Sequence, residues 1–279
     1  MPAPAPGEGN WAGAPSAAPD GNAGFVVAYR LRTAAERGGS VVIARSDDGE
    51  TLTTVAQLGK DRFGAESLER PALVRTDTGW AIFVSCATPH SKHWRIDALF
   101  APTPEALPEA DAGTIWPGDE HTGVKDPVIR RAPDGWHAWL CCHPLDEPGE
   151  EDRMSTAYAT SPNGVEWRSH GTVLTGRRGH WDARGARVTS VLADGRAAYD
   201  GRATKEENFS ERTGLAVPCG EHRLRAGGGP LAAVRYLDVV PLRGGFHRLF
   251  YEAPLPDGSH ELRTELVTGP PEQAPDAVR

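Results

Sequence analysis

Short apolar runs, each bounded by turn residues, recur along the chain at a fixed interval. Pro15, Pro71 and Pro127 stand at three of these runs, 56 residues apart (71 − 15 = 127 − 71 = 56). A Gly-aromatic pair follows at 79–80 and 135–136 and opens a second apolar run. Alternation of apolar and polar residues between Asp-Gly and Asn-Gly turns is typical of antiparallel strands. The pattern predicts repeated β-strands and no long helix.

The 56-residue step defines a register of five positions. They are Ala14, Arg70, Asp126, Asp182 and Asp238. Each unit has room for about four strands, and five units nearly fill the 279 residues. Radial repetition of four-stranded sheets is a β-propeller, whereas a long β-sandwich would not need five matching units. We therefore predict an all-β, five-bladed β-propeller with about four antiparallel strands per blade. It would be one domain over 1–279, with approximate blades 10–60, 66–117, 121–175, 179–226 and 232–268.

Composition narrows the possible partners. The net charge of −8 gives no reason to expect nucleic acid or a phospholipid surface. No apolar run reaches the roughly 18 residues of a membrane span, and the first residues lack the features of a signal peptide. The four cysteines have no metal-site spacing, which favours reduced core thiols. We expect a cytoplasmic protein with a small-molecule substrate and no cofactor or bound metal; the oligomeric state stays open.

The register residues should meet at one mouth of the central channel, because the first strand of each propeller blade lines that channel. Asp126, in "VKDP", is the leading candidate for a functional acid, although an ion pair with Arg70 or Arg184 would also explain a buried aspartate. The segment "HWDARGARV" places Asp182, Arg184 and Arg187 close together. Arginine binds carboxylates in a bidentate way, so this segment is a candidate anion clamp.

Loops between the second and third strands should rim the same mouth, and they are rich in charged and aromatic residues. Tryptophan at a rim can stack on a sugar ring, although half-buried packing is the alternative. The charged residues of the fourth blade could instead form ion pairs between strands. A metal site would need His121, His143 and Asp152 to converge, which their spacing does not indicate. The candidate substrate-binding residues are Trp11, Arg70, His93, Trp94, His121, Lys125, Arg184, Arg187, Asp200, Arg202, Glu211, Arg212, Tyr236 and Glu252.

Several motifs, taken in order, resemble the furanosidase superfamily of five-bladed propellers, which includes glycoside hydrolase families 32, 43, 68 and 130. They are Lys125-Asp126-Pro127, "SPNGVEW" at 161–167, "SDDG" at 46–49 and "ERTGLA" at 211–216. The resemblance implies three inner-strand carboxylates: a nucleophile or base, an acid that orients or tunes its neighbours, and a general acid. It assigns Asp126 to the middle role and Asp182 to the next blade, where the family more often has Glu.

The first blade departs from this family pattern, because Ala14 stands where the resemblance implies an acid. Glu69, Asp238 and Glu252 are candidate replacements, and strand alternation puts Glu69 and Arg70 on opposite faces. The leading hypothesis is a glycoside hydrolase-like enzyme of secondary metabolism that acts on a small soluble glycoside or sugar-derived metabolite through Asp126, Asp182 and Glu69. The alternatives are a lyase, isomerase or cyclase on the same fold, and a non-catalytic sugar-binding propeller.

Overall fold

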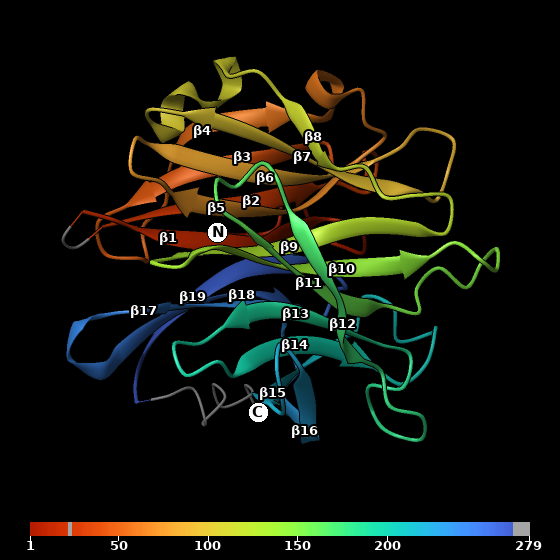
Figure 1. Cartoon of the computed structure of the whole chain (residues 1–279). Coiled ribbons are helices and arrows are strands. Elements are labelled where there is room, and N and C mark those ends of the chain that lie inside the picture. Colours follow the sequence, from red (N-terminus) through yellow and green to blue (C-terminus); the bar gives the residue numbers. More distant parts are fainter. Residues whose placement is uncertain (22–23, 270–279) are drawn as a thin grey trace.

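The computed structural model describes residues 1–21 and 24–269, and these form five consecutive antiparallel blades (Figure 1). Blade one holds β1 (Trp11–Asp20), β2 (Gly24–Arg32), β3 (Ser40–Ser46) and β4 (Thr53–Gly59); blade two holds β5 (Leu68–Arg75), β6 (Trp80–Ala87), β7 (Trp94–Ala101) and β8 (Gly113–Trp116). Blade three holds β9 (Thr122–Ala132), β10 (Gly135–Pro144), β11 (Ser155–Ser161) and β12 (Arg168–Thr175); blade four holds β13 (Gly185–Val191), β14 (Ala197–Arg202), β15 (Arg212–Pro218) and β16 (Leu224–Ala232). Blade five holds β17 (Arg235–Pro241), β18 (Phe246–Pro254) and β19 (His260–Thr268). The predicted all-β propeller is confirmed.

The fifth blade differs from the expected four strands, since only three strands are present between residues 235 and 268. Its outer strand β19 pairs with β1 at Trp11 and His260, which joins blades five and one into a single sheet. Met1 exchanges two backbone hydrogen bonds with Leu262, at 2.8 and 3.0 Å. The N-terminal segment therefore covers the edge that a fourth strand would otherwise occupy, and it closes the ring.

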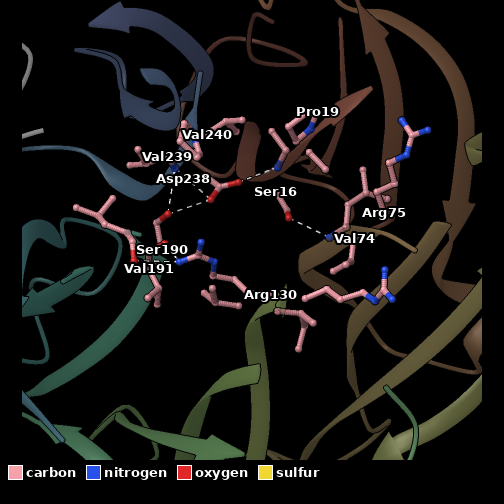
Figure 2. Close-up of a pocket in the computed structure, with 18 of the residues that line it drawn as sticks. Ser16, Pro19, Val74, Arg75, Arg130, Ser190, Val191, Asp238, Val239 and Val240 are labelled. Carbon is pink, nitrogen blue, oxygen red and sulfur yellow. Dashed lines mark hydrogen bonds between the residues drawn. The ribbon is translucent and has the colours of Figure 1, made fainter. Parts of the chain in front are cut away.

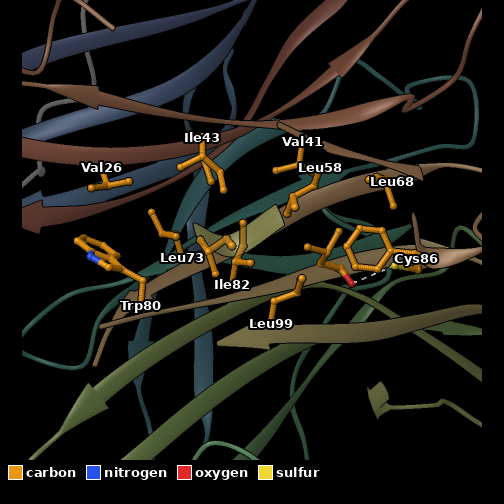
Figure 3. Packing of buried hydrophobic residues seen from close by; sticks show 14 of the residues in the cluster. Val26, Val41, Ile43, Leu58, Leu68, Leu73, Trp80, Ile82, Cys86 and Leu99 are labelled. Atoms are coloured by element: carbon orange, nitrogen blue, oxygen red, sulfur yellow. Dashed lines mark hydrogen bonds between the residues drawn. The ribbon is translucent and has the colours of Figure 1, made fainter. Parts of the chain in front are cut away.

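One hydrophobic cluster lies between each neighbouring pair of blades. Between blades one and two, Val26 and Ile43 face Leu73, Ile82 and Leu99 (Figure 3). Burial of each such side chain contributes about 1.5–3 kcal/mol. These clusters hold the inner strands in a fixed ring around the channel.

The cysteines are free thiols, two of them in the core and one on the surface. Cys86 and Cys141 are buried as expected, but Cys219 is exposed. Across residues 1–21 and 24–269, none of the helices has the length and apolar character needed to traverse a bilayer.

The Ser-x-Asn/Asp-Gly turns hold the outer strands of their blades. Ser161 Oγ accepts the Gly164 N–H at 2.9 Å, and Asn163 Oδ1 accepts the N–H groups of Val165 and Glu166. The turn at 46–49 repeats this pattern, with Ser46 accepting the Gly49 N–H at 2.8 Å. Gly164 has φ of 78°, a conformation that favours glycine. These motifs are therefore structural ties and lie away from the site.

A bulge interrupts the pairing of the inner strands near their starts. Two residues lie opposite one partner at 14–15, 69–70, 126–127 and 236–237. Ala14, Asp126 and Tyr236 have φ of 52°, 49° and 53° there. The 56-residue register thus holds for Ala14 and Asp126. Elsewhere it slips, because Glu69 and Tyr236, not Arg70 and Asp238, are the first bulge residues of their strands.

Candidate functional site

A cavity of about 140 Å³ lies at the end of the channel where the inner strands begin. Glu69, Lys125, Arg187 and Tyr236 reach it from the starts of β5, β9, β13 and β17. The ends of the second strands add residues such as Arg30 and His143, and loops between second and third strands add Asp152, Phe209 and Glu211. We call this cavity the near mouth. The loops rim it in the way that the repeat pattern predicts.

Asp126 lies buried beneath the near mouth. Its backbone N–H donates to Ser85 Oγ at 2.8 Å, which anchors the bulge to blade two. Its Oδ2 accepts Arg187 Nη1 at 2.9 Å and the Tyr236 hydroxyl at 3.4 Å, whereas Oδ1 has no partner among the described residues. Burial alone would raise the pKa of Asp126, but Lys125 and Arg187 outweigh it and hold the pKa well below the usual range. Asp126 is therefore a permanent carboxylate with one free acceptor.

Arg187 joins three blades at the floor of the cavity. Its side chain is 2% exposed and donates to Asp126 on β9, to Asp200 on β14 at 2.8 Å and to the Tyr236 hydroxyl on β17 at 2.8 Å. The guanidinium also lies 3.8 Å from the centroid of the Tyr236 ring. Burial raises the pKa of Tyr236 well above its usual value. The hydroxyl therefore keeps its proton, which it donates in a hydrogen bond to Asp126 Oδ2.

Oppositely charged residues alternate around the rest of the near mouth. The chain of contacts runs Glu69–Arg30–Glu252–Arg235–Glu211–Arg202–Asp152, and its distances beyond the close Glu69–Arg30 pair are 2.8, 2.6, 2.7, 2.7 and 3.1 Å. Burial opposes the charge on Glu211, yet Arg235 and Arg187 lower its pKa to about 2. The pKa values of Glu69 and Glu252 are likewise lowered, with Arg30 acting on both carboxylates. These acids are ionised at any physiological pH.

Burial shifts two other groups toward their neutral forms, Asp200 and His143. Burial raises the pKa of Asp200, although its carboxylate accepts from Arg187, the Tyr236 N–H and the Thr213 hydroxyl. Burial, helped by Lys125, lowers the pKa of His143 to about 3, so its imidazole is neutral. Its Nε2 is buried without a hydrogen-bond partner among the described residues. His143 faces the near mouth as an unprotonated base.

Seven of the predicted site residues line the near mouth: Glu69, Trp94, Lys125, Arg187, Arg202, Glu211 and Tyr236. Asp126, Asp200 and Glu252 lie directly behind them, in contact with Arg187 or Arg235. Trp94 presents its ring 4.7 Å from Lys125 Nζ. Trp11 is 2% exposed and its ring stacks on that of His260, with the ring centroids 4.8 Å apart. It therefore packs behind the cavity and does not line it.

Other predicted residues lie outside the cavity. Asp182 precedes β13 in a turn, where it accepts from Arg177 at 2.9 Å and from the Tyr199 hydroxyl at 2.9 Å. The expectation that it starts an inner strand is wrong, because that strand begins only at Gly185. Arg184 pairs with Asp152 at 2.5 Å, and Arg212 pairs with Glu207 at 3.5 Å.

The last three predicted residues also have no place in the near mouth. His93 bonds Thr88 at 2.9 Å. The His121 side chain is 77% exposed and lies beside Glu120. Arg70 points along the channel and donates to the carbonyls of Pro15 and Thr189.

Two arginines that line the near mouth, Arg30 and Arg235, were not among the predicted site residues. Arg30 is 1% exposed and Arg235 is 3% exposed, and both hold the carboxylate of Glu252. The available signal was an arginine inside an apolar strand, as in "VVAYRLR", because a buried arginine requires a buried acid. Within the described residues, no three His, Cys, Asp or Glu side chains are grouped so that they could hold a metal ion.

No family model and no curated protein matches the chain, whereas solved structures match over nearly its whole length. An α-L-arabinofuranosidase from Lactobacillus brevis has a TM-score of 0.69 at 14% identity, covering 95% of this chain and 93% of that chain. A β-1,2-mannobiose phosphorylase from Listeria innocua gives 0.69 at 13% identity, with 96% and 92% covered. A thermostable family-43 glycoside hydrolase gives 0.69 at 12% identity, with 95% of each chain covered. The chain thus has the five-bladed propeller fold shared by the family-43 glycoside hydrolases and the mannoside phosphorylases of family 130.

Proposed function

We propose that the protein is an enzyme that acts in the near mouth on a small, sugar-derived and negatively charged metabolite. The observation that carries this proposal is the meeting of Asp126, Arg187 and Tyr236 from three blades, with Asp126 Oδ1 and His143 Nε2 left unpaired. A network that only joined blades would satisfy its buried acceptors. Asp126 and Tyr236 also adopt positive φ, and such strain is concentrated at functional sites.

Cationic donors in the cavity wall would bind an anionic group of the substrate. Six cationic residues line the cavity: Arg30, Lys92, Lys125, Arg187, Arg202 and Arg235. Seven acids accompany them: Glu69, Glu151, Asp152 and Glu211 in the wall, and Asp126, Asp200 and Glu252 directly behind it. A carboxylate on the substrate would meet guanidinium and ammonium donors, which bind such groups strongly. The cavity volume of about 140 Å³ lies below the ~300–1,000 Å³ typical of pockets for drug-sized ligands, which limits the substrate to a small molecule.

The protonation states favour acid–base chemistry without an attacking carboxylate. The low pKa of His143 makes it a weak base by itself, so a bound substrate anion beside Lys125 would have to raise that pKa before His143 takes a proton. The Tyr236 hydroxyl, held by Arg187, would return a proton at a second substrate atom. Arg187 and Lys125 would stabilise the negative charge that develops between these two steps. A proton removed at one substrate atom and a proton added at another describe a lyase, an isomerase or a cyclase. We therefore place this chemistry first.

Glycoside hydrolysis is the second candidate, and one observation favours it: Glu69 and Glu211 face the same cavity from blades two and four. The usual mechanism needs one carboxyl to protonate the leaving oxygen while the other attacks or activates water. Arginine contacts keep both carboxyls ionised, so one of them would have to take up a proton against these neighbours. Hydrolysis ranks lower for this reason.

The test is to incubate the purified protein in D2O with aldonic and uronic acids, and separately with aryl glycosides. We expect deuterium to enter a sugar acid, as followed by NMR, with no aryl release. The exchange should be lost in His143→Gln and kept in the control His93→Gln, which lies outside the cavity. Aryl release that Glu69→Gln abolishes would instead establish hydrolysis. Binding of sugar acids with neither reaction would overturn the enzyme proposal in favour of a binding propeller.

A further inference from the structure

The channel has a second cavity, of about 240 Å³, at the end opposite the near mouth (Figure 2). The ends of all five inner strands surround it, through residues such as Ser16, Val74, Arg130, Ser190 and Asp238. We call it the far mouth. Apart from Arg70, which lies in the bulge of β5, its inner-strand residues follow the bulges, whereas the inner-strand residues of the near mouth lie at or before them. The two cavities are therefore separate sites.

Arg70 lies at the inner end of the far mouth and is 1% exposed. Its Nε donates to the Pro15 carbonyl at 3.2 Å and its Nη2 to the Thr189 carbonyl at 2.7 Å. Its Nη1 is buried and has no hydrogen-bond partner among the described residues. Burial lowers the pKa of Arg70 although Asp238 and Asp126 attract the charge. Buried N–H donors are normally hydrogen-bonded, so this guanidinium can accommodate an additional acceptor.

Arg130 supplies a second guanidinium, which has no carboxylate partner among the described residues. Its Nη1 donates to the carbonyls of Val191 and Leu192, at 2.7 and 3.0 Å. Two other arginines of the far mouth are already neutralised, because Arg75 pairs with Asp20 and Arg131 with Asp77. Arg70 and Arg130 are therefore the cations of this cavity that a bound anion would neutralise.

The acid nearest to these two arginines cannot fully balance them. Asp238 accepts the Ala17 N–H at 2.7 Å and the Ser190 hydroxyl at 3.3 Å, as Figure 2 shows. Burial raises the pKa of Asp238. Two guanidiniums thus face one carboxyl. Much of the remaining wall is apolar, formed by Leu73, Val74, Val128, Val191, Val239 and Val240, although Ser16 and His247 also line it.

We propose that the far mouth binds a small organic carboxylate, with its carboxylate on Arg70 and Arg130 and its apolar tail against the valine wall. Arginine and carboxylate form short, charge-assisted hydrogen bonds in matching planes. An inorganic oxyanion would make no use of the valine wall, and any oxygen turned toward it would find no donor. This site is independent of the chemistry proposed for the near mouth.

Calorimetric titration of the full chain with hexanoate, hexanamide and inorganic phosphate tests the ligand class. Hexanoate should bind at least about tenfold more tightly than hexanamide, since an ion-paired hydrogen bond is worth that much. It should also bind more tightly than phosphate. Equal binding of hexanamide would overturn the anion site, and equal binding of phosphate would overturn the organic class.

Variants locate the site. Arg130→Gln should weaken hexanoate binding about tenfold, whereas the matched control Arg131→Gln, which removes an arginine already paired with Asp77, should change it less than twofold. Asp238→Asn should strengthen binding, because it removes a competing charge. Tyr236→Phe at the near mouth should leave hexanoate binding unchanged. Wild-type affinity in both Arg130→Gln and Arg70→Lys would overturn the proposal, whatever the fate of the near-mouth chemistry.

Discussion

The carboxylate of Glu252 occupies the space that a side chain on Gly13 would fill. A Cβ on Gly13 would lie well inside van der Waals contact with Glu252 Oε2, and Gly13 directly precedes Ala14. Glu252 therefore reaches from blade five to the first-blade position that lacks an acid. Arg30, Arg235 and His260 hold it there. Blade five thus places a buried anion beside blade one, although Arg30 and Arg235 keep it from the cavity surface.

This packing predicts the effect of Gly13→Ala. The added methyl must displace Glu252 from its arginines, and such overpacking costs about 1–3 kcal/mol of folding free energy. Differential scanning calorimetry should show a melting temperature lower by several degrees. The control Gly59→Ala has no atom near its new Cβ and should melt like the wild type. Equal melting temperatures of the two variants would show that the Glu252 side chain can move aside without a loss of folding free energy.

Removal of the Arg187 guanidinium should destabilise the protein, because it leaves buried carboxylates beneath the near mouth without this partner. Arg187→Met leaves the carboxylates of Asp126 and Asp200 buried without their shared guanidinium. Breaking such a buried pair costs about 3–5 kcal/mol. Chemical denaturation should report this loss, and the matched variant Arg184→Met at the half-buried rim should lose less. A loss in Arg187→Met no greater than that in Arg184→Met would contradict the assigned network.

Acid should destabilise the protein through His143. Its pKa of about 3 in the folded state lies below the usual 6.5, so the unfolded chain binds the extra proton between these values. Above pH 6.5, His143 therefore leaves the free energy of unfolding unchanged. Below pH 6.5 it lowers that free energy by up to about 1.4 kcal/mol per pH unit. Glu211, with a pKa lowered to about 2, adds a further loss as pH falls below its unfolded value near 4.3.

Melting temperatures measured from pH 4 to pH 8 check this dependence. His143→Gln should flatten the curve between pH 4 and 6.5. His121→Gln, at an exposed position, should leave the curve unchanged. An identical acid slope in His143→Gln and the wild type would mean that His143 is not held neutral by burial.

The fold could be predicted from the sequence because the same pattern of strands and turns recurs along the chain. Pro15, Pro71 and Pro127 mark one step, and each unit reports the same strand pattern independently. The site was readable in part, because its geometry depends on where each strand begins. Asp182 lies on the 56-residue step but belongs to a turn, since the fourth blade starts three residues later.

Other site residues depend on contacts between blades, which no local pattern encodes. Arg30 and Arg235 meet at Glu252 although they are 205 positions apart in the sequence (235 − 30). His143 became a candidate base only because burial and Lys125 keep it neutral. Strand alternation predicted that Glu69 and Arg70 could not both face the channel, but they share a bulge and both do: Glu69 lines the near mouth and Arg70 the far mouth.

In the proposed function, His143 and Tyr236 transfer protons to and from a substrate in the near mouth. The most direct test compares deuterium exchange into the sugar-acid substrate by the wild type and by Tyr236→Phe, which keeps the aromatic ring beneath Arg187 but loses the hydroxyl. Loss of the hydroxyl should lower the rate by about 10²-fold or more, the usual contribution of a general acid, and should also lower the melting temperature because Arg187 and Asp126 lose a hydrogen-bond partner. A Tyr236→Phe protein that exchanges deuterium at the wild-type rate would contradict the proposed proton transfer.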